Sequence, residues 1–172
     1  AEVAASVCAF IKGRMEQMAR DEKIAPDTVA AVSAGSVTTP AHYFELAHAL
    51  EHARSNDRAA FENLATAYAR AAHLADASVG CEVDEALLGD AERVLLEAID
   101  AAEASVTSAL SAQDFPGVIS ALAALREPID AFFDEVMVMD EDERLRANRL
   151  ALLNRFAAVF SGIADLGVMA RR

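Results

Sequence analysis

His48, Glu51 and His52 stand in the order His-x-x-Glu-His, within the stretch HALEH. Two histidines four residues apart on a helix can both reach one zinc ion, and the neighbouring glutamate could act as a general base. This spacing is the signature of one class of zinc hydrolase, which also needs a third ligand and a cleft beside a sheet. The sequence indicates neither, and an amphipathic helix with two histidines on its polar side fits the pattern better. We therefore expect this chain to hold no metal ion at His48 and His52.

A second set of residues could bind nucleic acid. Several arginines of the last third of the chain gather beside an acidic stretch: Arg126, Arg144, Arg146, Arg149 and Arg155, with Asn148 among them. A guanidinium binds phosphate through two parallel hydrogen bonds and stacks on unpaired bases, and an asparagine amide can hydrogen-bond a base edge. Arg144 and Arg149 could instead pair with the acidic residues 140–143 on the same helix. The sequence alone leaves both interpretations open.

The overall charge limits how the chain could meet nucleic acid. Its 172 residues carry a formal net charge of −13, which repels a phosphate backbone at long range. RNA binding would therefore need a local basic patch, or basic parts of a larger protein. The first residue is Ala1 rather than methionine, so we expect the chain to be a segment of a longer polypeptide.

The composition is typical of a cytoplasmic helical protein. Cys8 and Cys81 fit no metal-binding or redox spacing, and free thiols are typical of a reducing compartment. No apolar run reaches the roughly 18 residues that a membrane span needs, and no signal peptide opens the chain. Hydrophobic residues make up 54%, much of it alanine, with only 4 prolines and 7 glycines, which favours a folded chain of long helices. We expect a cytoplasmic location and no membrane partner.

Apolar side chains recur at helical spacing along almost the whole chain, and no segment alternates as a β-strand would. The expected helices cover residues 1–20, 26–33, 41–54, 57–75, 91–112, 114–125, a stretch to 139 that Pro128 kinks or restarts, and 140–166. Acidic residues 140–143 would open the last helix, where negative charge suits the positive end of the helix dipole. The sequence therefore predicts an all-α fold, an antiparallel bundle of about seven to eight helices forming one domain over residues 1–172.

The stretch LREPIDAFFDEVMVM, residues 125–139, is interpreted as a helix that fills the core. Five of its residues are expected to form a buried seam: Phe132, Phe133, Val136, Met137 and Met139. The last helix carries a facing apolar stripe: Leu145, Leu152, Phe156, Val159, Phe160 and Ile163. The two methionines of the seam are interpreted as core filler rather than as a functional surface.

Residues 125–153, LREPIDAFFDEVMVMDEDERLRANRLALL, closely resemble the C-terminal domain of the β subunit of bacterial glycyl-tRNA synthetases. That domain is of the DALR anticodon-binding type. The closing stretch FSGIADLGVM resembles the end of the same family, and AYARAAHLA and CEVDEALL resemble its upstream parts. Arg70 stands at an arginine position of that family, whereas His73 stands where the family usually has asparagine.

Two alternatives stay beside this resemblance. Arginyl-tRNA synthetases carry a related domain at their end and share the Phe-Phe-Asp-x-Val-Met-Val core. Their chains usually finish in a Pro-Glu-Arg-Met-like tail, whereas this chain ends in VMARR. A helical module that binds only proteins is an alternative from a different class, and an absence of tRNA binding would favour it.

The resemblance implies a role within a larger enzyme. The whole enzyme would join glycine to tRNA(Gly) with ATP and magnesium, with the activating site on a separate α subunit and no catalytic residue or cofactor in this chain. The expected partners are tRNA(Gly), the rest of the β subunit and the α subunit, but not DNA. An anticodon loop offers unstacked bases, which side chains can hold. The candidate tRNA-binding residues are Arg70, Arg126, Arg146, Asn148, Arg149 and Arg155.

Overall fold

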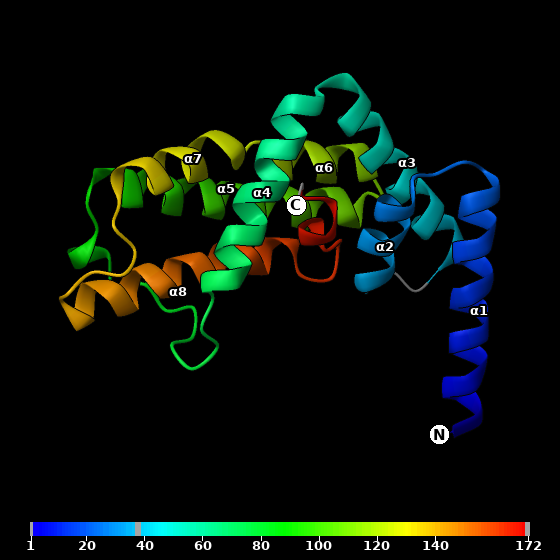
Figure 1. The fold of residues 1–172 in the computed structure, drawn as a ribbon, viewed down its shortest axis with the longest axis horizontal. Helices are drawn as coiled ribbons and strands as arrows, with labels where there is room; N and C mark the ends of the chain where they lie inside the picture. Colours follow the sequence, from blue (N-terminus) through cyan, green and yellow to red (C-terminus); the bar gives the residue numbers. More distant parts are fainter. Residues whose placement is uncertain (1, 37–38, 171–172) are drawn as a thin grey trace.

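The computed structural model describes residues 2–36 and 39–170, and this part of the chain is helical without any strand, as predicted (Figure 1). The α-helices are α1 (Glu2–Asp21), α2 (Pro26–Ala34), α3 (Pro40–Asn56), α4 (Arg58–Leu74), α5 (Asp90–Ser111), α6 (Phe115–Ala123), α7 (Arg126–Glu135) and α8 (Glu143–Phe160). Two short 3₁₀ helices are η1 (Glu85–Leu87) and η2 (Leu166–Met169). Ala1, Arg171 and Arg172, which entered the sequence analysis, lie outside the described residues.

Side-chain caps fix where several helices begin. The carboxylate of Asp57 accepts a hydrogen bond from the Ala60 amide (2.9 Å) at the start of α4, and Asp142 accepts one from the Arg144 amide (2.8 Å) at the start of α8. Asp114 caps α6 in the same way. Such a cap satisfies an amide that otherwise lacks a partner and stabilises the helix by about 1 kcal/mol. These local signals explain why the predicted starts lie close to the observed ones.

The prediction that the helix continues to residue 139 is wrong for its last four residues, because α7 ends at Glu135. Val136 has an extended backbone (φ −113°, ψ 122°), and in an extended segment successive side chains point to opposite sides. Val138 therefore lies in the core, while Met137 and Met139 are 73% and 59% exposed. The prediction that these two methionines are core filler is wrong.

The adjacent phenylalanines of α7 also have different environments. Phe132 is fully buried, whereas Phe133 is half-buried at the edge of the helix, and their ring centroids lie 5.5 Å apart in an edge-on arrangement. Pro128 lies in the first turn of α7, where a helix tolerates proline, so the chain restarts there as a separate helix rather than kinking. The predicted seam is confirmed for Phe132 and holds only in part for Phe133.

The last helix ends at Phe160 and not near Leu166 as predicted. Gly162 has a φ of 82°, a left-handed conformation that favours glycine and turns the chain away from the helix axis. The Gly162 carbonyl accepts a hydrogen bond from the Ser36 amide (2.9 Å), which ties this turn to the end of α2. The chain beyond the turn forms η2, which packs against α2 and α4.

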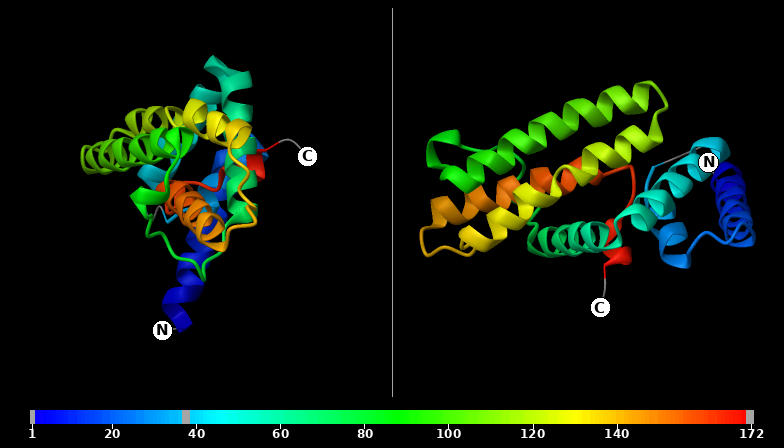
Figure 2. Two further views of the ribbon diagram at one scale, coloured as in Figure 1. Left: turned by 90° about the vertical axis from the view of Figure 1, so that its left-hand side faces the viewer. Right: turned by 90° about the horizontal axis from the view of Figure 1, so that it is seen from above.

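The second half of the chain forms one elongated body. In Figure 2, α5 runs in one direction, α6 and α7 return along it, and α8 runs back again. Helix α5 contacts α6, α7 and α8, and α4 lies against α7, α8 and η2. Fully buried side chains fill the centre of this body: Leu95, Ile99, Phe132, Leu152, Phe156 and Phe160. At the other end of the molecule α1 contacts α2 and α3, and its first half extends beyond the rest of the molecule (Figure 1).

Candidate nucleic-acid interface

Arg149 is enclosed, with only 14% of its side chain exposed. Its Nε donates to Glu92 Oε1 (2.7 Å), and its Nη1 donates to Asp140 Oδ2 (2.6 Å) and to the Met137 carbonyl (2.9 Å). Burial opposes the charge of the guanidinium, but the hydrogen bonds to Glu92 and Asp140 outweigh it and raise the pKa of Arg149. The Arg149 side chain thus connects α8 both to α5 and to the segment that follows α7. The predicted pairing of Arg149 with the acidic residues 140–143 is confirmed at Asp140.

Two further candidates are also held by carboxylates. Arg155 on α8 pairs with Asp100 Oδ1 (2.6 Å) and Glu103 Oε2 (2.9 Å), both on α5. The hydrogen bond to Glu103 raises the pKa of Arg155 in spite of its partial burial. Arg126, at the start of α7, pairs with Glu127 Oε1 (3.0 Å). These contacts give Arg155 a role in holding α5 and α8 together.

The remaining arginines near the start of α8 differ from each other. Arg146 donates to the Asp140 carbonyl (2.8 Å), and its guanidinium lies 3.6 Å from the Glu143 carboxylate. Arg144 is exposed and forms no ion pair with a described residue, so the proposed pairing of Arg144 with residues 140–143 is not observed. Arg144 is therefore a free cation beside the segment that follows α7.

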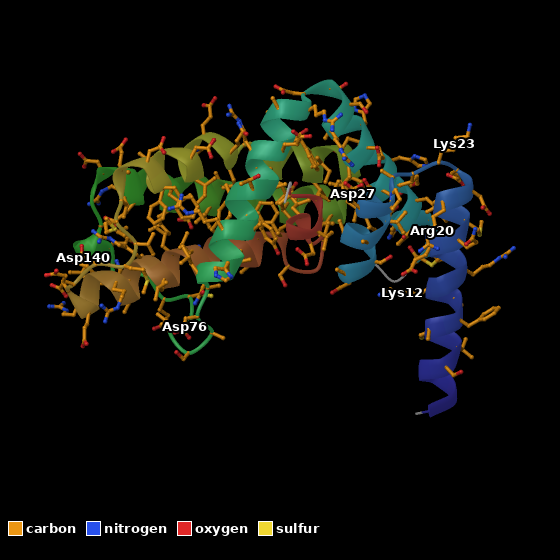
Figure 3. All side chains as sticks on the ribbon, viewed as in Figure 1. Lys12, Arg20, Lys23, Asp27, Asp76 and Asp140 are labelled. Atoms are coloured by element: carbon orange, nitrogen blue, oxygen red, sulfur yellow. The ribbon has the colours of Figure 1, made fainter. Side chains whose placement is uncertain are left out.

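Asn148 is buried, and its amide is used within the protein. Its Oδ1 accepts from the Asp84 amide (2.7 Å) and its Nδ2 donates to the Asp84 carbonyl (3.1 Å). Asn154, which the sequence analysis missed, binds the amide (3.0 Å) and carbonyl (2.8 Å) of Asp76 and donates to the Gly80 carbonyl (2.6 Å). Both asparagines hold the exposed loop between α4 and η1, which carries Asp76 and projects from the body (Figure 3). A buried, satisfied amide is not free to read a base edge.

Arg70, in the last part of α4, has a different environment from the other candidates. Its guanidinium carbon lies 4.0 Å from the centroid of the Phe133 ring, in cation–π contact. The side chain is exposed and forms no ion pair within the described part of the chain. It lines a groove of about 580 Å³ between the ends of α4 and α7, together with His73, Met137 and Met139. We call these residues, with Phe133, the Arg70 groove.

The Arg70 groove has the chemistry that an unpaired base requires. The guanidinium is planar, and with Phe133 on one face its other face can stack on a base. Exposed methionine side chains offer soft, polarisable walls. Asp134 and Glu135 also line the groove, and carboxylates accept hydrogen bonds from the amino groups of bases but repel phosphates. The groove therefore suits the base of a nucleotide better than its phosphate.

A second hollow of about 340 Å³ lies beside the first and is lined by Asn63, Thr66 and Asp130 together with Arg70. Burial raises the pKa of the Asp130 carboxyl, and the nearby charge of Arg126 opposes that shift. Arg70 lines both hollows, so one side chain could contact two neighbouring nucleotides.

The sequence analysis missed Phe133, Met137 and Met139 as surface residues. The available signal was the alternation Val-Met-Val-Met directly after α7, because a period of two indicates extended chain with one side exposed. Periodicity cannot tell which of the two alternating sets faces outward, and here the valines face the core.

The residues of HALEH have structural partners. Glu51 Oε1 accepts hydrogen bonds from the Ala25 amide (3.0 Å) and the Thr28 hydroxyl (2.6 Å), so this carboxylate joins α3 to the start of α2. His48 Nε2 lies 3.1 Å from Glu22 Oε2, and His52 hydrogen-bonds Asn56. Among the described residues, no group of three or more potential metal ligands comes together.

The described part of the chain is thus an all-α domain that carries an arginine stacked on a phenylalanine beside an open groove. The family model for the DALR anticodon binding domain matches residues 64–170, from the middle of α4 through η2. The chain therefore belongs to the DALR anticodon-binding domain family. None of the described helices combines the length and the apolar character that a lipid bilayer would demand.

Known relatives extend this likeness to nearly the whole chain. The chain is 39% identical over 173 residues to a protein named glycine--tRNA ligase beta subunit from Aliivibrio fischeri (strain MJ11), a match that covers 98% of this chain and 25% of the relative. Proteins of the same name from Alteromonas mediterranea (36% over 177 residues) and Vibrio cholerae serotype O1 (38% over 173 residues) match 99% and 98% of this chain. The chain spans about a quarter of the length of these relatives.

Proposed function

We propose that this chain is the anticodon-binding part of the β subunit of a glycine–tRNA ligase, and that the Arg70 groove holds an unstacked base of the tRNA(Gly) anticodon loop. The relatives described above carry the glycine name, which favours tRNA(Gly) over the arginine tRNA considered as an alternative. The family match supports an anticodon as the ligand, and the open groove beside Arg70 supports that position for one of its bases.

One observation supports the choice of groove above all others. Four of the other arginines already bond carboxylates or carbonyls: Arg126, Arg146, Arg149 and Arg155. Arg70 instead stacks on an aromatic ring, and its guanidinium donates to none of the residues that the structure describes. A base that stacks on a guanidinium or aromatic face contributes about 1–3 kcal/mol of binding.

The complete enzyme would provide the chemistry. It would attach glycine to tRNA(Gly) with ATP and magnesium in the cytoplasm, with the activating site on an α subunit and no catalytic group or cofactor in this chain. An anticodon contact far from the reacting carboxyl group acts by placing the tRNA correctly. Its loss should therefore raise the KM for tRNA and leave the KM values for glycine and ATP unchanged.

Aminoacylation against tRNA(Gly) concentration tests this proposal in the complete enzyme. Arg70→Ala should raise the KM for tRNA by roughly 5- to 150-fold, the equivalent of about 1–3 kcal/mol of lost stacking. Arg70→Lys keeps the charge but not the planar stack, so it should recover only a small part of the loss.

The matched control is Arg58→Ala, which removes another exposed arginine of α4. Arg58 lies at the start of the helix, away from Arg70, and pairs with Glu62 (2.7 Å). This variant should glycylate tRNA like the wild type. Identical tRNA curves for wild type and folded Arg70→Ala would remove the groove from the binding site.

A further inference from the structure

Helix α1 carries a broad apolar stripe, and only one edge of this stripe is covered. Met15 and Ala19, one turn apart, are buried against the neighbouring helices. The rest of the stripe continues from this buried edge through Ile11 and Met18 to Val7 and Phe10, at the spacing of one side of a helix. Phe10 is 75% exposed and Val7 51%, so this part of the stripe is largely uncovered in the chain by itself.

A hollow lies next to the uncovered part of the stripe. It measures about 240 Å³ and runs between α1 and the helices that follow, with Cys8, Ile11, Met15, Val32 and Tyr43 in its lining. The Lys12 ammonium donates to the Ser33 carbonyl (2.6 Å) across this gap and holds α1 in place beside α2 (Figure 3). The exposed side chains and the hollow together form an apolar surface, which we call the α1 surface.

The similarity to known relatives indicates which polypeptide could cover the α1 surface. The matches to glycine–tRNA ligase β subunits cover 98% of this chain and so extend into α1, whereas the anticodon-binding family model begins only at residue 64. Helices α1–α3 are therefore shared with β subunits but lie outside the matched anticodon-binding domain. Those relatives are about four times as long as this chain, so most of such a polypeptide would lie elsewhere.

We infer that the α1 surface docks onto the rest of the β-subunit polypeptide, so that α1–α3 connect the anticodon-binding helices to the body of that subunit. This inference rests on the proposed function. Exposed apolar surface is stabilised when another protein surface removes it from water. Residues 1–24 hold as many basic as acidic side chains, so they lack the negative charge of the whole chain. A second copy is a poorer partner, because two chains of net charge −13 repel each other.

The two cysteines provide a built-in test. Cys8 lines the hollow and Cys81 lies in the distant loop after α4, and both are free and exposed. In the 172-residue chain both thiols should react readily with N-ethylmaleimide. Peptide mass spectrometry measures the rate of modification at each cysteine. In the complete β subunit, Cys8 should react on the order of tenfold more slowly relative to Cys81, because its access would require undocking. An unchanged ratio of the two rates would overturn the inference.

A variant pair shows whether the α1 surface itself provides the protection. In the complete subunit, Phe10→Ser should restore the reactivity of Cys8, whereas Val94→Ser, at an exposed valine of α5, should not. Protection that survives Phe10→Ser would also contradict docking through this surface. Neither measurement of Cys8 reactivity uses tRNA, so the two proposals can fail separately. A subunit that protects Cys8 but supports no glycylation would contradict only the proposed function. A subunit that supports glycylation with a fully reactive Cys8 would contradict only the docking.

Discussion

At the residue scale, Phe132 and Phe133 are neighbours with different tasks. Phe132 is fully buried among the helices of the body, and Phe133 is half-buried beneath the guanidinium of Arg70. On a helix, consecutive side chains point about 100° apart, so one can face the core while the other lines a groove. The sequence shows two identical residues, and only the packing of α7 distinguishes them.

Alanine substitutions at these two positions should separate packing from binding. Phe132→Ala should lower the free energy of unfolding by about 3–5 kcal/mol, and Phe133→Ala by only about 1–2 kcal/mol, because less of its ring is removed from water. Phe133→Ala should instead weaken tRNA binding, since Arg70 loses its support. Urea denaturation followed by circular dichroism measures both energies, and equal losses would contradict the assignment of Phe133 to the groove.

The Asp140 carboxylate should make the stability of the protein depend on pH. Hydrogen bonds from the Asp142 amide and from Arg149 lower the pKa of the Asp140 carboxyl. A carboxyl whose folded pKa is lowered stabilises the protein fully above its ordinary pKa, near 4, and this stabilisation is lost as the pH falls through the folded pKa. Wild type should therefore be more stable than Asp140→Asn at pH 7, with a gap that narrows below about pH 4. A gap independent of pH in urea titrations would refute this account.

At the scale of elements, α8 positions the loop between α4 and η1 through two asparagines. Asn148 is buried with both of its polar atoms bonded to Asp84, so Asn148→Ala leaves main-chain groups without partners and should cost about 1–3 kcal/mol. Asn154→Ala should mainly loosen the loop, and amide hydrogen exchange at Asp76 should become faster. Exchange at wild-type rates in Asn154→Ala would show that the loop does not depend on α8.

Helix starts were predictable because their signals are local. Asp57, Asp114 and Asp142 each cap the helix that follows within a few residues. The ends of α7 and α8 were not predictable, since apolar side chains continue beyond both, and an extended segment or a turn buries them as well as a helix would. Gly162 marked the turn, but its left-handed backbone becomes evident only in the fold.

The candidate site was predictable in kind but not in detail. The family resemblance indicated a tRNA-binding role and included Arg70 among six candidates. The fate of the others depends on partners far away in the chain, such as Glu92, which lies 57 residues before Arg149. Tertiary packing determines which arginines pair with carboxylates. The number of arginines in the sequence is therefore larger than the number available to bind RNA.

At the scale of the whole molecule, the proposed RNA-binding groove and the proposed docking surface lie toward opposite ends of the chain's fold. The segment that carries Asp140 lies at one end of the body, and Lys12, Arg20 and Lys23 mark α1 at the other (Figure 3). With a net charge of −13, the chain offers little long-range attraction to RNA, so we expect stacking in the Arg70 groove to matter more than charge. If the rest of the β subunit docks on α1, the Arg70 groove at the other end stays accessible to RNA.

The most direct test uses the five methionines as reporters in the chain. With ¹³C-labelled methyl groups, NMR would follow each methionine during titration with an RNA hairpin that carries the tRNA(Gly) anticodon loop. The methyl signals of Met137 and Met139 should shift, because both are exposed in the groove, whereas the exposed Met18 on α1 and the buried Met15 and Met169 should not. These shifts should disappear in Arg70→Ala. Shifts confined to other methionines, or equal shifts in Arg70→Ala, would contradict the assignment of RNA binding to the Arg70 groove.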